Sequence, residues 1–339
     1  MSRSQASILI LLGLLLALFW LAPEVPLLGF AAVLLALALR AGGTPLADRT
    51  GLPRWAAVLI VAALVVLAIG LAAWAAAGPL TKQAEQLAQE LPRSLETLRG
   101  AISGTGWGDW LIREADPSRL LGGGGAEGAA AAAASAASKT LGGLCNAVLV
   151  VLLALYLAVQ PEAYLRGLRH LFAPPLDASM RDTLEEVGHT LRGWLLGQAF
   201  AMAVAGTLTW IGLMLIGVPL AGLLATIVAL LNFIPVIGPM IGAVPAVLLA
   251  MTQAPILALW VIGLVVLVQT VEGNFLTPMV QSRTADLPPA LLLVTQVLTG
   301  ALFGLLGVAL AAPLSAMALV LVRRGYTEAW LGWPPKPMD

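Results

Sequence analysis

The sequence has very few of the residues that build catalytic or metal-binding centres. It holds one cysteine, Cys145, and two histidines, His170 and His189, which lie well apart in the chain. A single thiol can form neither an intramolecular disulfide nor a cluster of thiolate ligands. The long apolar runs contain no histidine, pair of acids or activated nucleophile, and no P-loop type of phosphate-binding sequence occurs. We therefore expect no metal, no cofactor and no enzymatic activity.

Charged residues are equally scarce. They make up 11% of the chain against 60% hydrophobic residues, whereas an average soluble domain has roughly 25% charged residues. The 18 basic and 18 acidic residues cancel, so net charge gives no reason to expect a nucleic-acid partner. No charged residue lies between Arg192 and Glu272, or between Asp286 and Arg323. These runs predict an all-α polytopic protein that spans a lipid bilayer.

The apolar runs predict about eight membrane segments and a small extracytoplasmic helical region. Arginines at 3, 40, 49 and 54 lie beside the first short spans, which places the amino terminus and the 40–54 loop in the cytoplasm by the positive-inside rule. The alternation of the later spans leaves the carboxyl terminus, with Arg323 and Arg324, in the cytoplasm as well. The first two arms, 8–22 and 26–39, are short for full spans. The resulting divisions are 1–78 (three membrane segments), 79–140 (extracytoplasmic helical linker region), 141–160 (fourth segment), 161–193 (cytoplasmic amphipathic helix), 194–325 (core with broken segments) and 326–339 (cytoplasmic tail).

Two of the segments, 219–251 and 288–322, are too long for a single crossing, and each is interrupted near its middle. The interruptions read "NFIPVIGPMIG" and "TGALFGLLG". Each segment is either a long kinked span or a re-entrant hairpin that returns to the side it entered from. A basic residue, Arg283, in the connecting loop favours hairpins, because hairpins place that loop in the cytoplasm.

The interruptions are costly in lipid, since proline removes a backbone donor and leaves carbonyl groups without a partner. Such groups are tolerated only where they face protein or water, and broken helices in mid-membrane are typical of transporters. Polar residues flank both interruptions and could line a cavity there: Asn232, Thr295, Gln296 and Thr299. The alternative is a pair of proline kinks buried by neighbouring helices.

Glu272 is the acid in the long apolar stretch between the two interruptions. An acid at the centre of a span costs roughly 2.5–3.5 kcal/mol on insertion scales, so it is a functional candidate by default. It could carry a proton, bind a cation or pair with Arg283. The alternative is an interfacial glutamate near the end of a span.

The stretches "LNFIPVIGPMIGAVPAVLLA" and "VEGNFLTPMVQSR" resemble the autoinducer-2 exporter family of bacterial membrane proteins, and the resemblance extends to the whole layout. It implies an inner-membrane exporter of small molecules, with some relatives resembling sodium/proton antiporters, and a homo-oligomer, possibly a pentamer. The loop after Arg283 departs from relatives that often show further basic residues there. Together with the polar residues above, the motifs identify these pathway candidates: Asn232, Phe233, Pro235, Gly238, Pro239, Glu272, Gly273, Asn274, Pro278, Thr295, Gln296, Thr299 and Phe303.

We therefore predict a secondary-active transporter in the bacterial inner membrane that exports a small polar signalling molecule or metabolite by alternating access. The region 219–322 would move against the earlier spans, with H⁺ or Na⁺ as a coupling ion and Glu272 as the ion-sensitive group. One alternative is a sodium(cation)/proton antiporter. Another is a membrane scaffold or regulator that transports nothing.

Overall fold

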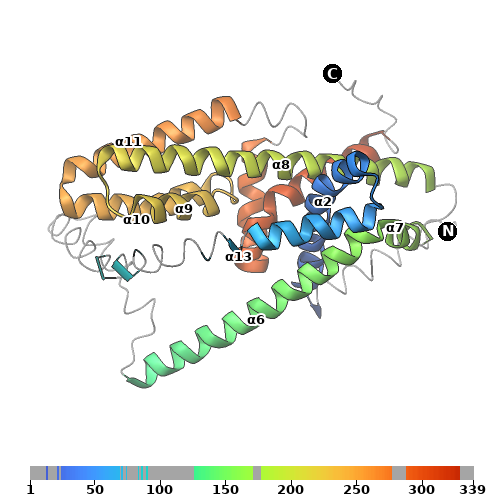
Figure 1. The fold of residues 1–339 in the computed structure, drawn as a ribbon, viewed down its shortest axis with the longest axis horizontal. Coiled ribbons are helices and arrows are strands. Elements are labelled where there is room, and N and C mark those ends of the chain that lie inside the picture. The colour runs from blue at the N-terminus through green and yellow to red at the C-terminus, as the bar shows by residue number, and fades with distance from the viewer. Residues whose placement is uncertain are drawn as a thin grey trace.

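The computed structural model describes residues 24–68, 126–170, 177–276 and 288–328, with residues 13, 21–22, 70–71, 74, 83, 85–86 and 89–90. Within these residues every regular element is helical, which confirms the predicted all-α class (Figure 1). The elements are α2 (Glu24–Thr50), a helix over Arg54–Ala68, α6 (Ala126–Val159), α7 (Pro161–His170), α8 (Asp177–Ile216), α9 (Ala221–Leu231), α10 (Ile237–Gln253), α11 (Pro255–Val271), η2 (Glu272–Leu276), α13 (Pro289–Val322) and η3 (Arg323–Glu328).

Small side chains hold the first helices together. Ala32 and Ala36 of α2 are buried with Ala154 and Ala158 of α6, so these two helix backbones approach closely. The helix does not end at Leu39, as the sequence suggested, but continues to Thr50. Packing explains the extension, because a Cβ added at Gly43 would lie 2.8 Å from a Val58 methyl group of the next helix.

α8 is one unbroken helix of 40 residues. The sequence divided this stretch into an amphipathic helix and a separate span, but the structure shows no boundary at residue 193. Val187, Leu191 and Trp194 are all buried, so one apolar face continues across the expected division. The separate short helix is α7, which bends by 90° from the end of α6.

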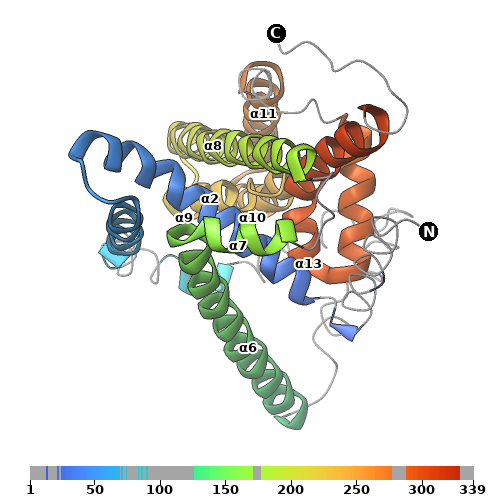
Figure 2. The same cartoon turned by 90° about the vertical axis from the view of Figure 1, so that its right-hand side faces the viewer.

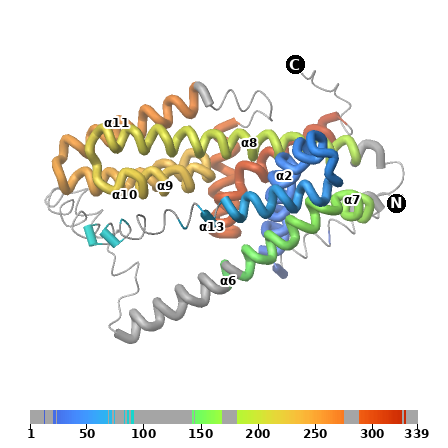
Figure 3. Tube along the Cα trace, in the orientation of Figure 1, coloured from blue at the N-terminus to red at the C-terminus, as the bar shows by residue number. Residues whose placement is uncertain are grey.

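The distal half is a layer of antiparallel helices packed along α8 (Figures 1 and 3). α9 runs back along α8, where a Cβ at Gly206 would lie 2.7 Å from the Ala229 Cβ. After residues 232–236 the chain reverses, and α10 returns along α9 with Gly238 against Leu231 and Gly242 against Val228. α11 then packs on α10 and α8 through buried Leu213, Leu249 and Val261.

α13 also changes direction at its interruption. Gly304 has φ 63° and ψ −147°, a conformation that only glycine adopts readily. Beyond Gly304 the chain folds back on itself. The two arms come so close that a Cβ on Gly307 would lie 2.1 Å from the Thr299 carbonyl oxygen. The change of direction of this element is visible in Figure 2. Both interrupted segments thus reverse, as a hairpin requires, while re-entry into a membrane from one side stays a prediction.

Among the residues that the structure describes, four helices are long and apolar enough to cross a membrane, or five if the bent α6–α7 pair counts as one span. Their outer faces carry large apolar side chains, among them Leu215, Val297 and Leu305, each at least 70% exposed to the surroundings. Such faces need lipid or protein around them. The chain is therefore a helical membrane protein, and the count of eight segments stays a prediction. The first run, 8–22, lies mostly outside the described residues.

Candidate functional site

Amide and carboxyl side chains from three elements meet at the first interruption. The Gln198 amide of α8 donates to the Asn232 carbonyl oxygen at 2.6 Å. The Asn232 side chain donates through Nδ2 to Oε1 of Glu272, 3.1 Å away at the end of α11. The Gln296 amide of α13 donates to the Pro235 carbonyl oxygen at 2.9 Å. We call Gln198, Asn232, Glu272 and Gln296 the amide–carboxylate cluster.

The local backbone explains why this cluster forms here. Val236 has a φ of 70°, which turns the chain sharply between α9 and α10. Pro235 has no N–H group, and regular helix bonding stops at this turn. The carbonyl groups of Asn232 and Pro235 are then satisfied by the side chains of Gln198 and Gln296. Distant helices thus supply the hydrogen bonds that the broken helix lacks, as a low-dielectric interior requires.

Burial makes the cluster chemically distinctive. The side chains of Asn232 and Gln296 are 0% exposed, and Glu272 is partly buried. Within the described part of the chain, the buried Asn232 Oδ1 and Gln296 Oε1 atoms have no hydrogen-bond donor. Glu272 also begins η2, a π-helical turn, and such turns are frequent at functional sites. These oxygen atoms could accept hydrogen bonds from a polar solute or coordinate a cation.

The structure brings four of the predicted pathway residues together, namely Asn232, Pro235, Glu272 and Gln296. Phe233 lies beside them and packs edge-on against Trp194, with ring centroids 5.8 Å apart. Gly238 and Pro239 are buried where α10 returns along α9, so they shape the reversal.

The remaining predicted residues lie elsewhere. Thr299 is hydrogen-bonded within α13, with its hydroxyl oxygen 2.9 Å from the Gly307 carbonyl oxygen. The Thr295 hydroxyl donates to the Leu291 carbonyl of its own helix. Phe303 packs against the apolar cluster around Leu34 and Leu310. Gly273 and Asn274 are exposed at the end of α11, and Pro278 falls outside the described residues.

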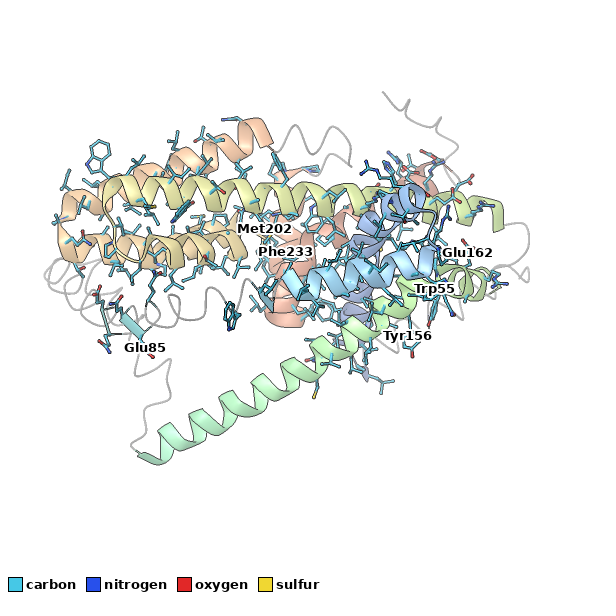
Figure 4. All side chains as sticks on the ribbon, viewed as in Figure 1. Trp55, Glu85, Tyr156, Glu162, Met202 and Phe233 are labelled. Atoms are coloured by element: carbon cyan, nitrogen blue, oxygen red, sulfur yellow. The ribbon has the colours of Figure 1, made fainter. Side chains whose placement is uncertain are left out.

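Two residues at this site were missed as site residues by sequence reasoning. Gln198 is the one amide side chain between Arg192 and Asn232, a signal that could have marked it. Arg192 lines a cavity of about 200 Å³ beside Gln198 and Phe233. Figure 4 shows Phe233 at the end of the α9–α10 pair and Met202 close by on α8; both line this cavity. Among the residues that the structure describes, no group of three or more histidine, cysteine or acidic side chains could hold a metal.

Broken helices that gather buried polar residues inside a helical membrane protein are typical of membrane transport proteins. The family described as "AI-2E family transporter" matches residues 8–326, and the chain belongs to this family. It is similar to "Putative transport protein YueF" of Bacillus subtilis, with 28% identity over 280 residues, 78% of this chain and 75% of that protein. It is also similar to "Putative transport protein YrrI" of the same organism, with 27% identity over 281 residues, 80% of this chain and 78% of that protein.

Proposed function

We propose that this protein is a secondary-active transporter that exports a small polar signalling molecule or metabolite by alternating access. The observation that carries the proposal is the amide–carboxylate cluster at the α9–α10 reversal. Its members come from α8, the reversal, α11 and α13. Movement of α9–α13 relative to α8 must therefore break or remake the bond between Gln198 and Asn232. Movement of α11 or α13 relative to the reversal must change the other two bonds. A solute that replaces some of them could bias that movement.

Glu272 is the proposed ion-sensitive member. Its carboxylate accepts a hydrogen bond from Asn232, and protonation would replace that acceptor by a donor or a weaker acceptor. The bond joins α11 to the reversal, so gain or loss of a proton changes the link between two elements of the proposed moving part. This is the coupling that transport driven by a proton gradient requires.

A second function is favoured by one observation, the two buried amide oxygens of Asn232 and Gln296 that have no donor within the described residues. Amide and carboxylate oxygens are suitable ligands for Na⁺, and transporters use unwound segments for this purpose. A sodium/proton antiporter would show ion exchange in proteoliposomes without any organic solute. An exporter coupled to an ion would show exchange only when the solute is present.

The positions of the arginines support an inner-membrane orientation with both termini in the cytoplasm. Arg192 donates to the carbonyl of Ala41, the residue after Arg40. Arg323 and Arg324 bind Glu186, which lies nearer the amino-terminal end of α8. The arginines thus gather at one end of the helices, as expected for a cytoplasmic end. We also propose that the protein forms a homo-oligomer, and the family resemblance implies a pentamer.

The test is solute movement in everted membrane vesicles, with a panel of small polar metabolites and imposed pH or sodium gradients. The Glu272→Gln variant keeps an acceptor for Asn232 but cannot change its charge, so we expect a large loss of gradient-driven transport. Glu185→Gln is the matched control, because Glu185 is exposed and paired with Arg181 on the surface of α8. Wild-type rates and pH dependence in Glu272→Gln would contradict the proposed role.

A further inference from the structure

A cavity of about 200 Å³ adjoins the amide–carboxylate cluster between α2 and α8. Its walls are largely alanine and leucine side chains, including Ala38, Leu195 and Ala199. The two polar side chains that line it are Gln198 and Arg192. An apolar cavity with a few convergent polar groups is the usual form of a small-molecule site.

Arg192 gives this cavity its chemical character. Its guanidinium group is always charged and carries several N–H donors in a planar fork that matches a carboxylate. One of them donates to the Ala41 carbonyl oxygen at 3.3 Å. Arg192 has no carboxylate partner within the described part of the chain, since Glu185 pairs with Arg181 and Glu186 pairs with Arg323 and Arg324.

An unpaired, half-buried cation beside apolar walls is costly to keep. The cost falls when an anion binds, because both the charge and the remaining N–H donors then gain a partner. The ligand that fits this combination has one negative group for Arg192 and a short apolar body for the alanine and leucine walls.

The size of the cavity limits that body. A volume of about 200 Å³ corresponds to about six to seven water molecules at the liquid share of about 30 Å³ each. A solute of about six non-hydrogen atoms would fill it, which is the size of a short-chain carboxylate. Drug-sized ligands need larger pockets, roughly 300–1,000 Å³.

Two residues connect the cavity to the proposed transport machinery. Gln198 lines the cavity and also donates to the Asn232 carbonyl oxygen, while Phe233 lines it from the reversal itself. A molecule in the cavity would therefore touch both α8 and the segment that joins α9 to α10.

We propose that this cavity binds a small organic monoanion with a short apolar chain, and that Arg192 recognises its carboxylate. The inference rests on the proposed transport function in one respect, because it identifies the class of solute that the transporter moves. The binding site itself stands or falls separately.

The test is equilibrium binding of radiolabelled butyrate to the purified full-length protein at neutral pH, with unlabelled butyrate and neutral butyramide as competitors. Butyrate is expected to bind saturably and butyramide to compete poorly. Arg192→Gln should weaken binding about tenfold to a hundredfold, the range for a lost hydrogen bond to a charged group. Arg192→Lys keeps the charge, so its affinity for butyrate should lie between those of the wild type and Arg192→Gln. Arg166→Gln, which removes an exposed arginine of α7, should bind as the wild type does.

A second variant tests the cavity without changing charge. Ala199→Phe places a ring in the cavity and should abolish butyrate binding, with folding checked by size-exclusion chromatography and circular dichroism. Absence of saturable binding by the wild type, equal competition by butyramide, or undiminished affinity in Arg192→Gln would each overturn the inference. Solute movement in vesicles tests the proposed transport function separately. If butyrate binds but no solute crosses the vesicle membrane, the proposed transport function is refuted and the anion site remains.

Discussion

The close approach of α10 to α9 makes Gly238→Ala the sharpest test of the fold around the site. A Cβ at this position would lie 1.7 Å from the Leu231 carbonyl oxygen and 2.6 Å from its carbonyl carbon. Both atoms belong to the backbone, so no side-chain rotation can relieve the contact. The two helices would have to separate by more than 1 Å to reach an acceptable distance of 3.0 Å.

That separation would disturb the reversal itself. The Gly238 N–H donates to the Ile234 carbonyl oxygen at 3.0 Å, and the adjacent Pro235 carbonyl accepts the bond from Gln296. Overpacking of this kind typically costs about 1–3 kcal/mol. We expect a fall of several degrees in the apparent Tm of detergent-solubilised protein at one fixed heating rate, since unfolding of such proteins is often irreversible. Transport should fall further, because the cluster loses its alignment.

The matched control is Gly263→Ala in α11, where an added Cβ meets no atom within 4 Å. Alanine is favoured over glycine in a helix by about 1 kcal/mol, so this variant should be as stable as the wild type or slightly more so. The opposite signs expected for the two substitutions make the comparison decisive. A Gly238→Ala protein with undiminished Tm and transport would refute the antiparallel packing of α9 and α10 described above.

Two further predictions follow from the contacts of α13 and α8. Gln296→Ala should lower stability by about 1–3 kcal/mol, because it leaves the partly buried Pro235 carbonyl without its donor, whereas Thr295→Val should change stability little. Glu186→Gln should weaken the link to Arg323 and Arg324; these groups are partly exposed, so we expect a loss of about 1 kcal/mol or less and a Tm that depends less on salt than in the wild type.

Much of the candidate site could be predicted from composition and pattern. Prolines and glycines inside apolar runs marked the reversals, and isolated polar residues marked Asn232, Glu272 and Gln296. Their partners were not predictable, because Asn232 and Glu272 are 40 positions apart and Gln296 lies 61 positions from Pro235. Nothing in the local pattern shows which distant side chain will meet a freed carbonyl group.

Packing also explains why some predicted residues lie away from the cluster. Thr299 was chosen because it flanks the second interruption, but the fold at Gly304 turns it toward Gly307. Gln198 was not among the predicted site residues, and it lies 34 positions before Asn232, beside neither interruption. Its role depends on the packing of α9 against α8, which brings the Asn232 carbonyl group within reach of the Gln198 amide.

The sequence by itself determined that this protein is helical, resides in a membrane and has backbone interruptions in its distal half. Hydrophobicity and backbone preferences are local properties, so they can be read from neighbouring residues. The tertiary structure alone decided that both interruptions reverse the chain, that side chains from α8, α11 and α13 meet the first reversal in one polar cluster, and that Arg192 lines a small cavity beside it. These features depend on contacts between residues far apart in the chain, which arise only when the helices pack together.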